Sequence, residues 1–196
     1  AAAAGMQPVA NLEHLCASFT GKQIIWLMVP AGPIVDELLQ QLTPLLQKGS
    51  IVIDGGNSFY KDSIRRNGAL AELGIDYLDC GTSGGTSGAL QGACTMIGGD
   101  PTAYQVVKPL LDAISVEGGT LYTGPSGSGH FAKMIHNGIE YGMMQSIAEG
   151  FEVLQRSDYE YDFAALSHLF NNGSVIRGWL MELTENAFRK DPGLDA

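Results

Sequence analysis

The sequence lacks the marks of a protein that binds nucleic acid or spans a membrane. Its 11 lysines and arginines form no run and are outnumbered by 21 acidic residues, which gives a net charge of −10 over 196 residues. A chain of that charge is a poor partner for nucleic acid or for an anionic membrane. No apolar run approaches the roughly 20 residues that a membrane span needs. We therefore expect neither nucleic acid nor membrane among its partners.

Cysteine is also scarce, with only Cys16, Cys80 and Cys94. Their spacing matches no metal-binding pair, and an odd number suits a reducing compartment better than a disulfide framework. We interpret all three as small buried hydrophobic residues and predict no metal site. The first residues, Ala-Ala-Ala-Ala-Gly, lack the basic and long apolar regions of a secretion signal, so we expect a cytoplasmic protein.

Short apolar segments alternate with helical patterns over the first two thirds of the chain. The segments of strand length are residues 23–29, 51–54, 76–79, 95–97 and 120–122. Helical patterns cover about residues 33–46, 59–73 and 102–113. Such alternation predicts an α/β fold with a parallel, doubly wound sheet.

The pattern changes after Gly124. One long helix is predicted from residue 128 to about 156, and shorter helices follow at about 162–170 and 175–189. We therefore place a domain boundary near Gly124, with an α/β part at residues 1–123 and an all-helical part at residues 124–196.

Polar residues recur at helical spacing within the predicted long helix. They are Lys133, His136, Asn137 and Glu140. A helix of about 3.6 residues per turn places them on one stripe. The segment around them is mostly apolar, which favours a site over a solvated charged stripe, although both interpretations stay open. An ammonium and a carboxylate two turns apart can exchange protons with the two ends of a small substrate.

Two glycine-rich segments follow predicted strands, where doubly wound sheets bind their ligands. Asp54-Gly-Gly-Asn-Ser58 comes after the second strand, and Ser58 suits the N-cap of the next helix. Gly81-Thr-Ser-Gly-Gly-Thr-Ser-Gly88 comes after the third strand, and its hydroxyl and backbone N–H groups suit a carboxylate or a phosphate. Each segment alone could be a tight turn that needs positive φ. Beside the polar stripe, the two together favour a ligand site.

Several segments occur in an order that matches a known family. They are Leu27-Met-Val-Pro-Ala-Gly32, Ile53-Asp-Gly-Gly-Asn-Ser58, Gly81-Thr-Ser-Gly-Gly85, Met96-Ile-Gly-Gly99, Gly124-Pro-Ser-Gly-Ser-Gly-His130 and Lys133-Met-Ile-His-Asn-Gly-Ile-Glu-Tyr141. On these segments the chain resembles the decarboxylating 6-phosphogluconate dehydrogenases, most closely their shorter form. The last segment is the most specific, because the broader β-hydroxyacid dehydrogenase superfamily does not generally share its His-Asn pair, Glu140 and Tyr141.

The resemblance implies a partial Rossmann-like NAD(P)-binding domain followed by the start of the family's helical C-terminal domain. It also implies a reaction of the pentose phosphate pathway. In that reaction, 6-phospho-D-gluconate is oxidatively decarboxylated to ribulose 5-phosphate and CO2. The cofactor would be NAD or NADP, and the sequence lacks the strand end that distinguishes the two.

The resemblance also implies roles for individual residues. Lys133 would take the proton of the substrate's 3-hydroxyl, which calls for a lowered pKa, and Glu140 would protonate C1 of the enediol. The substrate-binding residues would be Asn57, Ser83, Gly84, Gly85, His136, Asn137 and Tyr141. The residues lining the dinucleotide would be Val29, Pro30, Ala31 and Asn57. Long-form members commonly have a lysine where this chain has Pro30.

Two features of the family are not found in the sequence. No Gly-x-Gly-x-x-Gly loop follows an early strand, and the Gly-x-Gly at residues 127–129 opens the predicted long helix. The later basic segments that bind the substrate phosphate are missing too, and Arg177 is interpreted as a helix-surface charge rather than as their replacement. We therefore expect an internal fragment, inactive by itself, of a longer enzyme that forms a homo-dimer or homo-tetramer.

Two other functional interpretations stay open. One is a 3-hydroxyacid dehydrogenase of the same superfamily that does not decarboxylate its substrate. The other is a non-catalytic fragment that acts only as a folding or oligomer module. The intact pair of Lys133 and Glu140 favours an enzyme, and the absent glycine loop favours the module.

Overall fold

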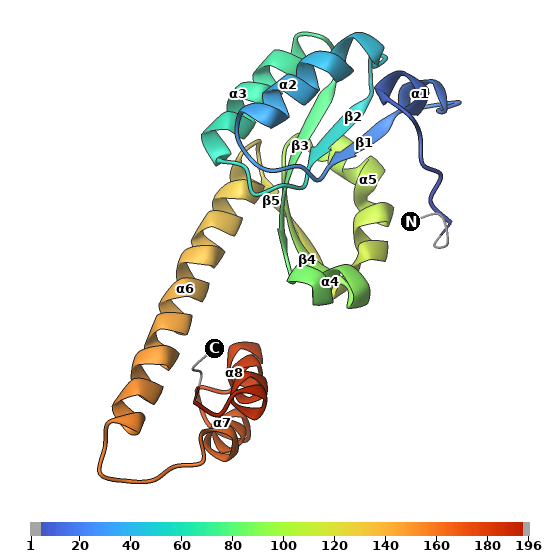
Figure 1. Cartoon of the computed structure of the whole chain (residues 1–196). Helices are drawn as coiled ribbons and strands as arrows, with labels where there is room; N and C mark the ends of the chain where they lie inside the picture. Colours follow the sequence, from blue (N-terminus) through green and yellow to red (C-terminus); the bar gives the residue numbers. More distant parts are fainter. Residues whose placement is uncertain (1–4, 194–196) are drawn as a thin grey trace. The chain divides into compact units, whose positions relative to one another are not determined.

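The computed structural model describes residues 5–193. The chain divides into two compact units, Ala1–Ile135 and His136–Ala196, and the boundary falls inside one long helix. We call them the α/β unit and the helical unit (Figure 1). Among residues 5–193, no helix combines the length and the apolar character that a bilayer crossing requires.

The described part of the α/β unit contains a five-stranded sheet in the order β1-β2-β3-β4-β5. The strands are β1 (Ile24–Leu27), β2 (Ile51–Asp54), β3 (Asp76–Ser83), β4 (Ala93–Gly98) and β5 (Ser115–Gly124). The pairs β1–β2, β2–β3 and β4–β5 are parallel. The predicted class, an α/β fold with a doubly wound sheet followed by helices, is therefore confirmed.

Strand β4 differs from the prediction of a fully parallel sheet. It runs antiparallel to β3, with Ser83 opposite Cys94. The connection between the two strands is only the short helix α4 (Gly85–Gln91), flanked by Gly84 and Gly92 at positive φ. A crossover to a parallel neighbour needs about a dozen residues or more, so this shorter connection brings the chain back antiparallel.

Helices cover both faces of the sheet and give three layers (Figure 1). On one face, Val52 and Tyr77 belong to a core that includes residues of α2 (Pro33–Leu42) and α3 (Tyr60–Ala71). On the other face, side chains of β2, β3 and β4 pack against α5 (Pro101–Ile114). The helix α1 (Leu12–Ala17), which the sequence analysis did not anticipate, adds Cys16 to the first core.

The three cysteines do not share one environment. Cys16 and Cys80 are buried, as predicted, and burial raises the pKa of the Cys80 thiol to about 12. Cys94 is exposed, so its interpretation as a buried residue is wrong. It lies on β4 between two buried residues, because alternate side chains of a strand point to opposite faces.

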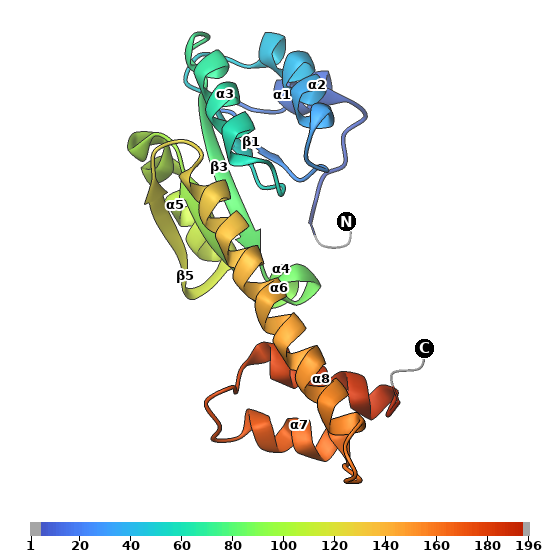
Figure 2. The ribbon, with the colours of Figure 1, turned by 90° about the vertical axis from the view of Figure 1, so that its left-hand side faces the viewer.

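The helical unit consists of the second part of α6 (Ser128–Gln155) with α7 (Phe163–Asn171) and α8 (Trp179–Lys190). Figure 2 shows α7 and α8 side by side. Their core contains Phe151 of α6 and two residues of α8, Met181 and Phe188. Because α8 begins after residue 178, the exposed Arg177 lies in the preceding connection, and its interpretation as a helix-surface charge is wrong.

Candidate active site

Matching positions on two neighbouring strands carry an aspartate. Asp54 of β2 and Asp79 of β3 are register partners, and both are fully buried. Burial of a carboxylate is unfavourable unless hydrogen bonds satisfy its oxygens. The groups that donate hydrogen bonds to these two carboxylates therefore determine which segments are held against the ends of β2 and β3.

Asp54 is surrounded by donors from its own strand end and from β3. Its Oδ2 accepts hydrogen bonds from Ser58 Oγ at 2.7 Å and from the Tyr77 hydroxyl at 2.7 Å. Its Oδ1 accepts from the backbone N–H of Gly56 at 3.1 Å. Burial and then the neighbouring Asp54 raise the pKa of Tyr77, so its hydroxyl remains a donor. Asp54 thus fixes the loop that presents the exposed Asn57.

The hydrogen bond of Ser58 to Asp54 corrects the prediction that Ser58 is an N-cap. Helix α3 begins at Tyr60, and its N-cap position is Phe59, which makes no side-chain hydrogen bond to the helix. Spacing alone could not separate the two roles, because a serine hydroxyl satisfies either a helix terminus or a buried carboxylate.

Asp79 instead accepts hydrogen bonds from the beginning of α6. The backbone N–H of Gly127 donates to Oδ1 at 2.6 Å, and the backbone N–H of His130 donates to Oδ2 at 2.9 Å. A negative charge is favourable there, because the N-terminus of a helix carries a partial positive charge. The His130 ring also lies 2.7 Å from the hydroxyl of Ser63 on α3. The first turn of α6 is therefore fixed to both β3 and α3.

Glycines allow that turn to lie directly on the sheet. A Cβ added to Gly129 would lie 2.4 Å from the carbonyl oxygen of Met96 and 2.5 Å from that of Asp79. A Cβ added to Gly81 would lie 2.5 Å from the Cβ of Lys133. Separations under 3.0 Å are essentially never seen for real Cβ atoms, so neither glycine position accepts a side chain in this packing.

This packing determines where the structure places Lys133. The residue is only 9% exposed and lies against Gly81, two positions before Ser83 at the end of β3. Asn57 follows β2, the parallel neighbour of β3, so it belongs to the same edge of the sheet. The structure thus packs Lys133 against β3 beside Ser83, and it places Asn57 in the loop after the neighbouring parallel strand.

The predicted glycine-rich turn at residues 81–88 is shorter than expected. Gly81 to Ser83 belong to β3, and α4 begins at Gly85. Gly84 and Gly85 have φ values of 124° and 55°, a conformation that glycine adopts without steric penalty. The prediction of one long turn is wrong, and the positive-φ segment that remains is Gly84-Gly85, directly after Ser83.

The other residues of the polar stripe lie in the helical unit. His136 Nδ1 is 3.6 Å from Glu140 Oε2 and 3.3 Å from Asn137 Oδ1. The side chains of His136 and Glu140 are 38% and 39% exposed, and Tyr141 is 68% exposed. The contact of His136 with Glu140 agrees with helical spacing and leaves the imidazole and the carboxylate accessible to a ligand.

The loops after β1 and β2 touch each other at the carboxyl ends of their strands. The backbone N–H of Gly55 donates to the carbonyl of Leu27 at 2.9 Å. A Cβ added to Gly56 would lie 2.9 Å from the carbonyl oxygen of Val29. Pro30 and Ala31 are exposed beside them. This uncharged strand-end surface fits the dinucleotide contact predicted for Val29, Pro30, Ala31 and Asn57.

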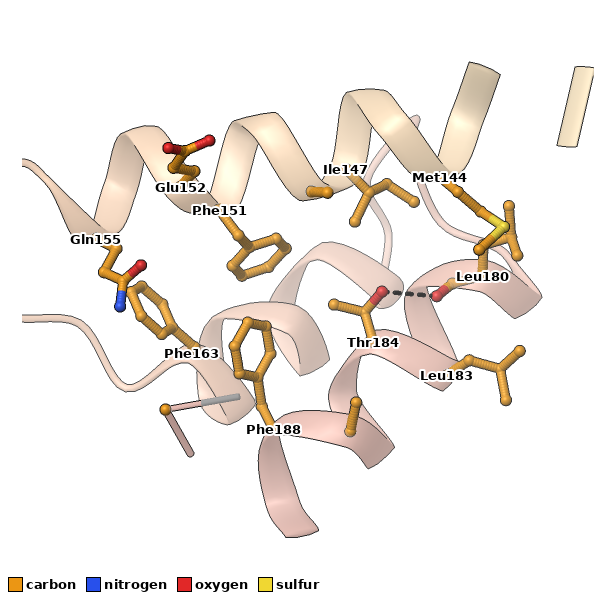
Figure 3. Close-up of a pocket in the computed structure, with 13 residues that line it drawn as sticks. Met144, Ile147, Phe151, Glu152, Gln155, Phe163, Leu180, Leu183, Thr184 and Phe188 are labelled. Carbon is orange, nitrogen blue, oxygen red and sulfur yellow. Dashed lines mark hydrogen bonds between the residues drawn. The ribbon is translucent and has the colours of Figure 1, made fainter. Parts of the chain in front are cut away.

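The described residues also form a groove inside the helical unit. It has a volume of about 470 Å³ and a mostly apolar lining from α6, α7 and α8 (Figure 3). The Thr184 hydroxyl in its wall donates to the carbonyl of Leu180 at 2.8 Å, within its own helix. None of the predicted site residues lines this groove. Residues 5–193 also contain no group of three or more His, Cys, Asp or Glu side chains suited to a metal ion.

The buried residues that hold the site together were not among the site residues predicted from the sequence. Asp54 and Asp79 were seen only as strand ends, and Tyr77 only as part of a strand. A charged residue within an otherwise apolar strand is a usable signal, because such residues are almost never fully buried unless paired. The identity of each partner depends on contacts between distant parts of the chain.

The fold and the strand-end loops together define a Rossmann-like dinucleotide-binding protein. The model of the NAD binding domain of 6-phosphogluconate dehydrogenase matches residues 1–124, and the model of the enzyme's C-terminal domain matches residues 129–191. The chain therefore belongs to the 6-phosphogluconate dehydrogenase family.

Individual relatives agree with this family. A Bacillus subtilis protein provisionally named as a 6-phosphogluconate dehydrogenase is 53% identical over 97% of this chain and 64% of its own length. The NAD(+)-dependent, decarboxylating 6-phosphogluconate dehydrogenase of Haloferax volcanii is 45% identical over 97% of this chain and 63% of its own length. The chain thus spans somewhat less than two thirds of these relatives.

A solved structure is similar as well. The Plasmodium falciparum 6-phosphogluconate dehydrogenase, determined with NADP+ and with its substrate, has a TM-score of 0.82 and 39% sequence identity. The similarity covers 90% of this chain and 39% of that protein. The domain boundary and the individual site residues stay predictions, because these similarities do not test them.

Proposed function

We propose that the full-length protein containing this chain oxidatively decarboxylates 6-phospho-D-gluconate to ribulose 5-phosphate and CO2. The reaction would reduce NAD or NADP, and the bound nicotinamide supplies an acceptor for the hydride from C3 of the substrate. The observation that chiefly supports this proposal is the buried Lys133 packed against Gly81, two residues from Ser83.

Lys133 acts first as a base in this proposal. It accepts the proton of the 3-hydroxyl while the hydride leaves C3, so an uncharged amine is required at the start. The β-keto acid then loses CO2, because the ketone accepts the electron pair of the broken bond as an enolate. Lys133, now protonated, stabilises the developing oxyanion. Glu140 then delivers a proton to C1 of the enediol.

The remaining residues bind and orient the substrate and the cofactor. Ser83, Gly84 and Gly85 receive the substrate carboxylate, because a hydroxyl and unhindered backbone N–H groups meet after β3. The residues that contact the hydroxyl groups or the phosphate are Asn57, His136, Asn137 and Tyr141. The residues that line the dinucleotide are Val29, Pro30, Ala31 and Asn57.

The test uses Lys133→Met and Glu140→Gln in the full-length protein. We expect Lys133→Met to lower both NAD(P)H formation and CO2 release by about 10²- to 10⁴-fold, the usual contribution of an acid–base group. With Glu140→Gln, single-turnover experiments should show NAD(P)H forming well before ribulose 5-phosphate. Lys108→Met is the matched control, because it makes the same change in an exposed side chain.

Near-normal NAD(P)H formation by Lys133→Met would show that the role of Lys133 is assigned wrongly. NAD(P)H formation without CO2 release by the unmodified protein would favour the 3-hydroxyacid dehydrogenase interpretation. In that interpretation, Lys133 and Asn137 are the residues that the chain shares with the whole β-hydroxyacid dehydrogenase superfamily. Glu140 instead belongs to the motif of the decarboxylating 6-phosphogluconate dehydrogenases.

We infer further that residues 1–196 alone do not oxidise 6-phosphogluconate. The sequence holds no Gly-x-Gly-x-x-Gly loop after a strand, and that loop supplies the backbone donors for the pyrophosphate. Tight binding of the dinucleotide to this chain in calorimetry, or steady turnover in an absorbance assay, would refute this inference.

The cellular setting is part of the same proposal. We infer a cytoplasmic enzyme of the pentose phosphate pathway, in keeping with three free cysteines.

We also infer a homo-dimer or homo-tetramer. Exposed apolar side chains on α6, such as Ile139, Met143 and Val153, support association. Sedimentation of the full-length protein tests the oligomeric state.

A further inference from the structure

The guanidinium of Arg66 is buried between the two loops assigned to the dinucleotide. Arg66 lies on α3 and is 2% exposed. An arginine has five N–H donors, and here each has an acceptor. The five contacts are Nε to Asp36 Oδ1 at 3.0 Å, Nη2 to Asp36 Oδ2 at 3.0 Å, Nη2 to the Gly32 carbonyl at 3.1 Å, Nη1 to Ser58 Oγ at 3.3 Å and Nη1 to Asp54 Oδ2 at 3.5 Å.

These acceptors belong to three separate elements. Gly32 ends the loop after β1 and is the N-cap of α2, with a φ of 105°. Asp36 lies in the first turn of α2. Asp54 and Ser58 enclose the loop after β2. One side chain therefore connects the loop that contains Val29 to Ala31 with the loop that contains Asn57.

The charge of Arg66 is well compensated. Burial opposes the charged form, but the interactions with Asp36 and Tyr77 together outweigh it and raise the pKa of Arg66 above its ordinary value. The Asp36 carboxyl has a lowered pKa for the same reason. A buried pair of this kind often adds little stability compared with apolar residues of similar volume. The position of Arg66 between two ligand loops therefore calls for a role other than stability alone.

We propose that Arg66 is a positioning residue for the dinucleotide, because it sets the separation of the loops after β1 and β2. This inference rests on the proposed function, which assigns Val29, Pro30, Ala31 and Asn57 to the cofactor. The two loops already lie close together, because a Cβ added to Gly56 would lie 2.9 Å from the carbonyl oxygen of Val29, so a shift of one loop displaces the other. A lysine cannot replace Arg66, because its ammonium has three donors and lacks the planar fork.

The first test separates binding of the dinucleotide from binding of the substrate. The dissociation constants of NAD+, NADP+ and 6-phosphogluconate are measured by calorimetry in the full-length protein. We expect Arg66→Lys to weaken binding of the preferred dinucleotide about tenfold, as the loss of one hydrogen bond to a charged group would. Binding of 6-phosphogluconate should weaken clearly less, because Asn57 is the only one of its assigned residues that lies in a loop contacted by Arg66.

Arg65→Met is the matched control. Arg65 is the neighbouring arginine and also pairs with Asp36, at 3.0 Å, but its side chain is 57% exposed and the described contacts reach neither loop. Arg65→Met should leave both dissociation constants unchanged. If Arg66→Lys does not fold, Asp36→Asn replaces it, because that variant removes the carboxylate that orients the guanidinium.

The second test observes the loops without ligand. The indole Nε1 of Trp26 lies 2.9 Å from Met28 Sδ, and a Cβ added to Gly55 would lie 2.1 Å from the same nitrogen. The ring therefore lies against both the loop after β1 and the loop after β2, and its environment changes when either loop moves. The protein is labelled with 5-fluorotryptophan, and the Trp26 resonance is assigned by its loss in Trp26→Phe. We expect this fluorine resonance to shift in Arg66→Lys and to keep its position in Arg65→Met.

The outcomes separate this inference from the proposed function. An unmodified protein that binds the dinucleotide but does not oxidise 6-phosphogluconate would refute the proposed function. The role of Arg66 would then still be decided by the calorimetry and by the Trp26 resonance. Equal weakening of dinucleotide and substrate binding, or an unchanged dinucleotide constant with an unchanged Trp26 resonance, would overturn the role of Arg66. An unmodified protein that binds no dinucleotide would overturn both.

Discussion

The ends of β2 and β3 solve the same physical problem in two ways. Both strands bury an aspartate at the same register, but Asp54 is satisfied mainly by side chains and Asp79 by two backbone N–H groups at the start of α6, those of Gly127 and His130. Hydroxyl groups can reverse their role and accept a hydrogen bond, whereas a backbone N–H can only donate. The β2 end is therefore the more adaptable of the two, and the β3 end depends on one fixed geometry.

This difference matches the proposed division of labour. The β2 end holds a loop that contacts the dinucleotide, and the β3 end holds the helix that carries Lys133. A base that exchanges a proton with the substrate must stay within hydrogen-bond reach of it, so a rigid support is an advantage. The variants below test whether the two ends differ in this way.

The largest effect is expected from a change to the close packing at the β3 end. Gly129→Ala should destabilise the protein by about 3 kcal/mol, because its Cβ would meet three backbone atoms at 2.4 to 2.8 Å. Gly138→Ala is the matched change on the same helix, where nothing lies within 4 Å of the built Cβ. It should stabilise the protein by up to about 1 kcal/mol. Similar urea midpoints for the two variants would contradict the packing argument.

A direct comparison of the two aspartates should give the next largest effect. Asp79→Asn places an amide NH2 against a backbone N–H group and should cost about 2 kcal/mol in the free energy of unfolding. Asp54→Asn should cost less, about 1 kcal/mol, because two of its donors, the hydroxyls of Ser58 and Tyr77, can turn to accept, although the Gly56 N–H and Arg66 cannot. Urea unfolding of both variants checks this order, and the reverse order would show that the β2 end is the more rigid.

The smallest effect concerns the pH dependence at the β2 end. The pKa of Tyr77 is raised in the folded protein, so above pH of about 10 only the unfolded chain loses this proton. Fewer protons on the unfolded state mean that stability falls as the pH rises. Tyr77→Phe should cost about 1 kcal/mol at neutral pH and should show a shallower decline above about pH 10. Equal slopes for Tyr77→Phe and the unmodified protein would argue against a buried, protonated Tyr77.

Hydrophobic periodicity was sufficient for the class of fold and for most elements. The runs at residues 51–54 and 128–156 predicted β2 and α6 closely, because long or fully apolar patterns admit few alternatives. It failed for α4, where glycines and hydroxyl residues resemble a turn. It also failed for the direction of β4, because direction depends on the length of the connection and not on the strand's own composition.

The candidate site was predictable only in part for a related reason. Spacing within α6 placed His136, Asn137 and Glu140 on one stripe, and the contact of His136 with Glu140, four residues apart, agrees with it. Spacing said nothing of Asp79, 48 residues from Gly127 in sequence, or of Arg66, 34 residues from Gly32. Such pairs are joined only when strands and helices are stacked.

By itself, the sequence determined the periods of its strands and helices, the motifs of its family and the order of polar groups along α6. These are local properties, fixed by the repeat of the backbone and by the side chains that a segment contains. Only the tertiary structure decided which polar groups are buried and what satisfies them. Burial makes each unpaired donor or acceptor expensive, so the partners of Asp54, Asp79 and Arg66 follow from how the layers pack.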